Sequence, residues 1–278
     1  MQARALKRLL SLPPAKRLDV IAEGLHLIAE HVETLRADLE VLGDARRSRG
    51  FSILSTQAEE EAAKFLILLD LVRHGWKDQQ GVKRQIGYFY DHLARSIYAE
   101  VFDMRPADLK EVRVYVDNLR ESHYLDGPTD VDWIFRNQLI SRREDTLYVD
   151  YVHDDDGDRW STPARFDETV FGFTSPLLEL IGALRRMGCA SRAGLDVVAD
   201  AWRGVELDDD TRWQSVRTLN DRIVETLVRE GLNEVDATDE DASRVVDRWS
   251  FPLSSLDLSE LSVSLDRLRD IQRGAGSP

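Results

Sequence analysis

Apolar residues recur at alternating spacings of three and four along the first long segment of the chain. The members of this stripe are Leu18, Ile21, Leu25, Ile28, Val32, Leu35, Leu39 and Leu42. This spacing places apolar side chains on one face of an α-helix. Pro13-Pro14 stand where such a helix starts, and Gly43-Asp44 where it ends. We therefore expect a long helix whose apolar face forms the seam of an antiparallel helix bundle.

A second long helix is predicted from about Arg47 to His74, with Gly75 as its stop. Its stripe consists of Phe51, Leu54, Ala58, Glu61, Phe65, Leu68 and Val72. One member, Glu61, is a carboxylate, and a charge on a core face is costly unless it is paired or lines a cavity. Two interpretations stay open: Glu61 lines a pocket, or it pairs at the helix edge with Lys64.

The pattern then predicts shorter elements. A third helix spans about Val82 to Val101, a fourth runs from Pro106 to the Asp126-Gly127-Pro128 break, and a short fifth covers about Val131 to Arg142. After these the period changes to alternation with β-branched and aromatic residues, interrupted by an Asp-Gly turn. This change predicts a β-hairpin at about residues 146–162.

The remaining chain reads as helical again. The predicted helices are Ser175–Met187, Ala193–Trp202, Asp209–Gly231, Asp239–Trp249 and Ser259–Gln272. The expected fold class is thus mainly α: an antiparallel long-helix bundle with a small β-hairpin and additional C-terminal helices. We expect two regions, residues 1–165 with the bundle and hairpin, and an acidic helical region, residues 166–278, packed on it.

The amino-acid composition disfavours some classes of protein. The 278 residues are 42% hydrophobic, and their 37 basic and 51 acidic side chains give a net charge of −14. Such an acidic chain disfavours unassisted nucleic-acid binding, because phosphate contacts need local positive charge. No apolar run reaches the roughly 18 residues of a membrane-spanning helix, and the N-terminal pattern does not fit a signal peptide. We expect a cytoplasmic protein without a membrane partner.

Several familiar chemistries are missing from the sequence. It contains no glycine-rich phosphate loop, no G-x-S-x-G motif and no HExxH motif. No two of its six histidines are three or four residues apart, and Cys189 is its single cysteine. A histidine pair on a helix or a cysteine cluster for a metal is therefore excluded. We expect neither a metal nor another cofactor.

Three short motifs follow one another along the chain. They are Glu60-Glu61-x-x-Lys64, Phe89-x-x-His92-x-x-Arg95, and Leu147-Tyr-Val-Asp-Tyr151 followed by Trp160-x-x-Pro163. In this order they resemble the AbiV-type abortive-infection proteins, which belong to the HEPN superfamily of helical-bundle proteins. The resemblance covers roughly residues 20–190.

The resemblance implies a role in bacterial defence against phage, through shutdown of translation after infection. It also implies a homodimer, because many HEPN proteins are metal-independent ribonucleases with the active site at a dimer interface. Their usual motif is an arginine, often followed by Asn or Asp, with a histidine after four to six intervening residues. Here Arg136-Asn137 fits the start, but the histidine positions hold Ser141, Arg142 and Arg143. Whether the protein is an enzyme therefore stays open.

A metal-independent ribonuclease needs a proton donor or acceptor and cations that stabilise charge on the phosphate. Together with the resemblance, this requirement selects His92 as acid or base, with Arg95, Lys64 and Glu61, as the candidate catalytic set. The candidate RNA-binding side chains are Arg84, Arg142, Arg143 and Tyr148. The alternative is a buried polar network that ties the second and third helices to the hairpin.

Two functions follow. The first is an anti-phage effector that shuts down translation by acting on RNA. The alternative is a non-catalytic interaction or regulatory protein of the same fold, activated by a phage protein; a nucleotide-binding regulator is a third reading. A positive cleft of arginines beside His92 would favour RNA chemistry. Dispersed arginines paired with Asp and Glu would favour an interaction role.

Overall fold

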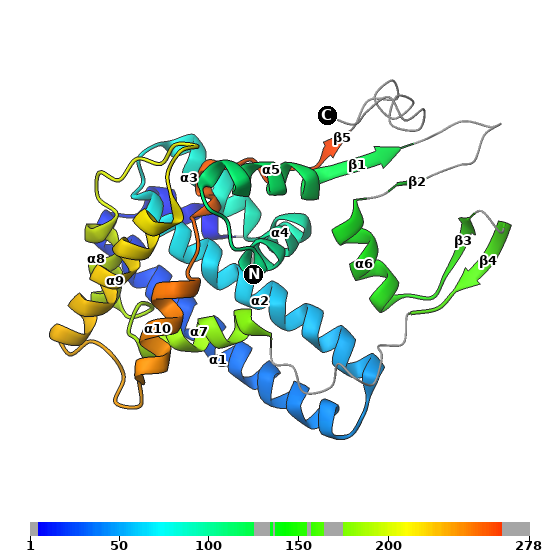
Figure 1. The fold of residues 1–278 in the computed structure, drawn as a ribbon, viewed down its shortest axis with the longest axis horizontal. Helices are drawn as coiled ribbons and strands as arrows, with labels where there is room; N and C mark the ends of the chain where they lie inside the picture. Colours follow the sequence, from blue (N-terminus) through cyan, green and yellow to red (C-terminus); the bar gives the residue numbers. More distant parts are fainter. Residues whose placement is uncertain (1–4, 125–133, 136, 155–156, 164–174, 263–278) are drawn as a thin grey trace.

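The computed structural model describes five stretches of the chain: residues 5–124, 134–135, 137–154, 157–163 and 175–262. Over these residues the protein is mainly helical with a few short strands (Figure 1), which confirms the predicted fold class at that level. Among the described helices, none combines the length and apolarity that crossing a membrane requires.

The bundle is built on helices α1 (Pro14–Asp44) and α2 (Ser48–His74), which lie side by side and antiparallel (Figure 1). The predicted stripe of α1 is buried at Ile21, Leu25, Val32, Leu35 and Leu39, as its spacing requires. Helix α2 is buried on all faces over its second half, since every residue from Phe65 to Arg73 is buried. It is therefore the central helix of the protein. It ends at Gly75, whose φ of 67° suits glycine.

The predicted helix over residues 82–101 is wrong, because two helices occupy this stretch: α3 (Gln79–Tyr88) and α4 (His92–Asp103). Asp91 causes the break. Its backbone is extended, and its carboxylate accepts a hydrogen bond of 2.9 Å from the backbone N–H of Ala94. This N-cap satisfies a donor that a continuous helix would bond internally.

Helix α5 (Leu109–Arg120) ends earlier than predicted, and the chain continues as strand β1 (Glu121–Tyr124). This strand pairs antiparallel with β2 (Ile134–Phe135) and parallel with β5 (Leu261–Ser262), so one short sheet joins distant parts of the chain. The described start of the predicted helix over 259–272 is thus a strand, and residues 263–272 lie outside the described residues.

The predicted hairpin is present as β3 (Asp150–Asp154) and β4 (Gly157–Ser161), paired in register from Asp150 with Ser161 to Asp154 with Gly157. It begins later than predicted, because Thr146 still belongs to helix α6 (Gln138–Leu147), where its hydroxyl donates to the carbonyl of Arg142. Figure 1 shows the hairpin projecting away from the helices.

Four helices follow: α7 (Pro176–Arg186), α8 (Arg192–Ala201), α9 (Trp213–Arg229) and α10 (Asp239–Arg248). They match the predicted set, except that α9 starts after the turn over residues 208–211. Helix α7 packs against α1 and α2, and α10 packs against α7 and α9. The predicted boundary between the two regions, at residues 165 and 166, lies outside the described residues.

A buried ion pair joins α2 to the end of the chain. Asp70 and Arg73, both on α2, are 2% and 3% exposed, and their side chains lie 3.2 Å apart. The second carboxylate oxygen of Asp70 accepts hydrogen bonds of 2.8 Å from the hydroxyl of Tyr98 and from the backbone N–H of Leu253. Arg73 donates to the carbonyl of Ser250 at 2.8 Å. The pair thus binds both α4 and the segment after α10 to the central helix.

Burial has the largest effect on the pKa values of Asp70 and Arg73. It raises the pKa of Asp70 and lowers that of Arg73 to about 10, because each charge is removed from water. The guanidinium carbon of Arg73 lies 4.2 Å from the ring centre of Trp202 and 4.6 Å from that of Trp249. Cation–π attraction to these two indole rings replaces part of the hydration that the Arg73 guanidinium loses on burial.

Asp70→Ala should therefore destabilise the protein strongly, because it leaves Arg73 as an uncompensated buried charge, at a cost of about 3–5 kcal/mol. Tyr98→Phe is the matched control, since it keeps the ion pair and removes only the hydroxyl, which donates to the carboxylate and accepts from Gln85; loss of the bond to the carboxylate costs about 1.5–3 kcal/mol. Urea unfolding measures both. Equal losses would show that the ion pair is not the main contribution.

A second ion pair predicts a dependence on pH. Arg186 on α7 donates through two nitrogens to Asp241 on α10, at 3.0 and 2.5 Å. These bonds lower the pKa of Asp241 from 3.8 to about 2. A lowered folded-state pKa stabilises the fold above the unfolded pKa, and the contribution is lost as the pH falls towards 2. Asp241→Asn should be less stable than wild type at pH 7, with the difference shrinking from pH 4 to pH 2 in urea unfolding. A difference independent of pH would contradict this assignment.

Candidate functional site

Glu60 is the centre of the candidate site. This residue of α2 is 4% exposed, and basic side chains from two other helices surround its carboxylate. Nδ1 of His92 lies 2.9 Å from Oε2, and a guanidinium nitrogen of Arg95 lies 3.3 Å from the same oxygen. Nε of Arg143 donates to Oε1 at 2.8 Å. We call Glu60, His92, Arg95 and Arg143 the Glu60 cluster.

The positions at which helices α4 and α6 begin determine where the basic side chains of the Glu60 cluster lie. His92 is the first residue of α4, directly after the capping Asp91, and Arg95 follows one turn later on the same face. Arg95 is held further by a 3.2 Å hydrogen bond from its Nε to the carbonyl of Asp91. Arg143 comes from α6, which begins at its N-cap Asn137, where the side-chain oxygen accepts from two backbone N–H groups.

His92 is the accessible member of the cluster. Its side chain is 51% exposed, whereas those of Glu60 and Arg95 are 5% and 8% exposed. Nδ1 also lies 2.8 Å from a guanidinium nitrogen of Arg95. A neutral imidazole uses Nδ1 for one contact, donating to Glu60 or accepting from Arg95. No hydrogen bond to Nε2 occurs within the described part of the chain. That nitrogen is therefore available for a proton transfer.

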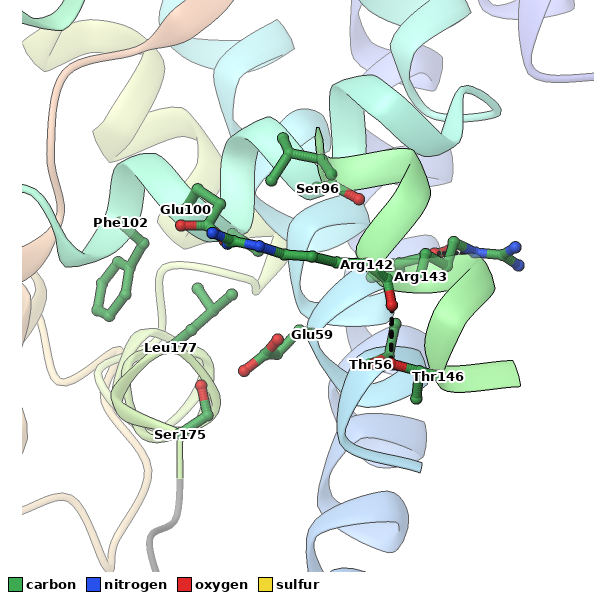
Figure 2. Close-up of a pocket in the computed structure, with 13 residues that line it drawn as sticks. Thr56, Glu59, Ser96, Glu100, Phe102, Arg142, Arg143, Thr146, Ser175 and Leu177 are labelled. Carbon is green, nitrogen blue, oxygen red and sulfur yellow. Dashed lines mark hydrogen bonds and ion pairs between the residues drawn. The ribbon is translucent and has the colours of Figure 1, made fainter. Parts of the chain in front are cut away.

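A pocket of about 320 Å³ lies beside the cluster, between α2, α4, α6 and the start of α7 (Figure 2). Its charged lining residues carry both signs: Glu59, Glu60, Glu100, Arg142 and Arg143. Arg142 extends across the pocket to Glu100, 3.2 Å away, whereas Arg143 points to the opposite side (Figure 2). The described lining thus holds three carboxylates against two guanidinium groups, so the pocket has no excess of positive charge.

Of the predicted site residues, the structure brings together His92, Arg95 and Arg143, with Arg142 on the same helix as Arg143. Glu61 and Lys64 pair with each other instead, with 2.5 Å between Nζ and Oε1. Of the two interpretations of Glu61, the structure thus has the pair at the helix edge.

Two predicted RNA-binding residues lie elsewhere. Arg84, on α3, donates to the carbonyl of Ser254 in the last described segment, at 3.3 Å. Tyr148 follows α6 and is 59% exposed, and it does not line the pocket. Arg84, Arg95, Arg142 and Arg143, whose gathering beside His92 would have favoured RNA chemistry, therefore do not form one cleft there.

The sequence prediction chose Glu61 and missed Glu60 as the central carboxylate. The apolar stripe assigned one buried face to α2, whereas the second half of this helix is buried all round. The long apolar run from Phe65 to Leu69 was the available signal, because a helix without a polar face is a central one. On such a helix Glu60 needs a partner as much as Glu61 does.

The described residues contain no group of three or more His, Cys, Asp and Glu side chains placed to hold a metal ion. Cys189 is fully buried, and burial raises the pKa of its thiol to about 12. A thiol with that pKa stays protonated and is a poor nucleophile at neutral pH.

Comparisons of the chain with protein-family models, with curated proteins and with solved structures found no match. The resemblance to AbiV-type proteins thus rests on the three motifs.

The adjacent carboxylates of Glu60 and Glu61 have different partners, so their substitution should have different effects on stability. Glu60→Gln should cost about 1.5–3 kcal/mol, because the ion pair with the buried Arg95 and the charge-assisted hydrogen bond from Arg143 are weakened. Glu61→Gln is the matched control on the same helix and should cost less, because among the described residues Glu61 has one cationic partner, Lys64, whereas three basic side chains contact Glu60. Urea unfolding compares the two variants. A larger loss for Glu61→Gln would contradict the central role of Glu60.

Proposed function

We propose that the protein is a bacterial defence effector of the AbiV and HEPN type that acts by binding a partner rather than by cleaving RNA. The defence role, the HEPN-like bundle and the expected homodimer rest on the resemblance. The mode of action rests on one observation: each arginine of the predicted site that belongs to the Glu60 cluster or lines the pocket beside it contacts a carboxylate. Arg95 and Arg143 contact Glu60, and Arg142 contacts Glu100.

These pairings weaken the case for a free ribonuclease. An arginine that binds phosphate must present its guanidinium to the ligand, so Arg95 and Arg143 would have to leave a buried carboxylate. The net charge of −14 repels RNA as well. A surface that carries both signs suits another protein, where charge complementarity selects the partner. We propose a component of the translation machinery as the target and a phage protein as the activator.

A specific observation favours the second candidate, a metal-independent ribonuclease. His92 is half-exposed while its Nδ1 faces the buried Glu60. A carboxylate that orients an imidazole in this way prepares the other ring nitrogen for general acid–base catalysis. Arg95, beside the ring, would stabilise negative charge that develops on a phosphate.

One experiment separates the two candidates. RNA integrity, protein synthesis and phage resistance are measured in bacteria that produce the wild-type protein, with and without infection. The binding role predicts arrested protein synthesis with intact RNA, and little change in His92→Ala. The ribonuclease predicts cleaved RNA in wild type and intact RNA in His92→Ala. The matched control is His26→Ala, because His26 is an exposed histidine of α1 that pairs with Glu30 one turn away on the same helix.

Normal protein synthesis and normal phage growth in cells that produce the wild-type protein would overturn the defence role itself. Circular dichroism of the purified variants shows whether each is folded. Both substitutions replace side chains that are more than half exposed, so both variants should fold like wild type.

A further inference from the structure

A second pocket, of about 470 Å³, lies where the end of α4, the start of α9 and the end of α10 meet. This volume is within the range of about 300–1,000 Å³ that is common for small-molecule sites. We propose that this pocket binds a small molecule in which a flat ring carries a phosphate monoester. The proposal concerns a site separate from the Glu60 cluster and does not depend on the function proposed above.

The apolar wall of this pocket suits a flat ring. Phe102, Met104, Pro106 and Trp213 line it. The indole of Trp213 is half-buried, and its ring centre lies 6.1 Å from that of Phe251, which supports the side away from solvent. An aromatic face held in this way offers a stacking surface for a ring.

The two sides of the pocket are tied together by the backbone. The N–H of Trp213 donates to the carbonyl of Ala107 at 2.9 Å, and the N–H of Leu109 donates to the carbonyl of Thr211 at 3.1 Å. Ser250, another lining residue, accepts from the buried Arg73. The walls are therefore pre-organised, which lowers the entropy cost of binding.

The charges of this pocket suit an anion. Arg105 and Arg248 line it, and neither guanidinium has a hydrogen bond or ion pair anywhere in the part of the chain that the structure describes. Among the lining residues that the structure describes, the one carboxylate is Asp247, which forms an ion pair with Arg217 at 2.7 Å from its Nε. In a protein of charge −14, two unpaired arginines in one pocket are a local excess of positive charge.

The apolar wall and the two arginines together indicate the class of ligand. Planar guanidinium groups form charge-assisted, often bidentate, hydrogen bonds with phosphate. Stacking on Trp213 then places the ring of the same molecule against the apolar wall. A phosphate without a ring, or a ring without a phosphate, uses only half of the site.

Isothermal titration calorimetry of the full chain tests the proposal with adenosine 5′-monophosphate and phenyl phosphate. Adenosine, phenol and inorganic phosphate are the partial probes. At least one of the two monoesters should bind, and its ring and phosphate parts should each bind about tenfold more weakly or worse. Higher salt should weaken binding, because the contacts are ionic.

Variants assign the binding to this pocket. Arg248→Gln and Arg105→Gln should each raise the dissociation constant about tenfold. Trp213→Leu should weaken the monoester and leave inorganic phosphate unchanged. Arg203→Gln is the matched control, because Arg203 is an exposed arginine paired with Asp200 on α8, and it should bind like wild type.

Absence of binding by both monoesters at millimolar concentration would overturn the proposal. Equal affinity for inorganic phosphate would overturn the ring part of it, and unchanged affinity in both arginine variants would place the ligand elsewhere. Arg105 is exposed, so Arg105→Gln keeps the test valid even if Trp213→Leu fails to fold.

Discussion

The architecture depends on a charge that the protein buries at its centre. Asp70 and Arg73 lie on the most buried part of α2, where water cannot hydrate either group. Their attraction offsets this loss only when every remaining lone pair and N–H is satisfied. The hydroxyl of Tyr98 and the backbone at Ser250 and Leu253 supply most of those partners, whereas Nε of Arg73 is buried without a hydrogen bond among the described residues. The central helix therefore specifies where α4 and the segment after α10 must lie.

The two pockets differ in how their arginines are used. Beside the Glu60 cluster, the cations are compensated by carboxylates; in the second pocket, Arg105 and Arg248 are not. A compensated site has little electrostatic attraction left for a phosphate, whereas an uncompensated one attracts it. Phe102 lines both pockets, so a ligand in one contacts a wall of the other.

The long helices could be predicted from the sequence because their apolar spacing persists over many turns, as in α1 and α2. The break at Asp91 and the strands β1, β2 and β5 could not. A cap competes with helix continuation through one hydrogen bond, and a strand of two to four residues is too short to show a period. At the site, His92 and Arg95 follow from their spacing on one helix. Their link to Glu60 required the tertiary packing of α2 against α4.

The contact between α2 and Ser250–Leu253 has a consequence for the order of events during synthesis. Domains begin to fold from the N-terminal side while the chain is still growing on the ribosome. Helix α2 is complete long before Ser250 is made, so the nascent bundle holds Asp70 and Arg73 without two of their partners. The core of the first half thus reaches its final hydrogen bonding only after α10 has been synthesised. Until then, the central helix holds a buried aspartate and a buried arginine that lack these two hydrogen bonds.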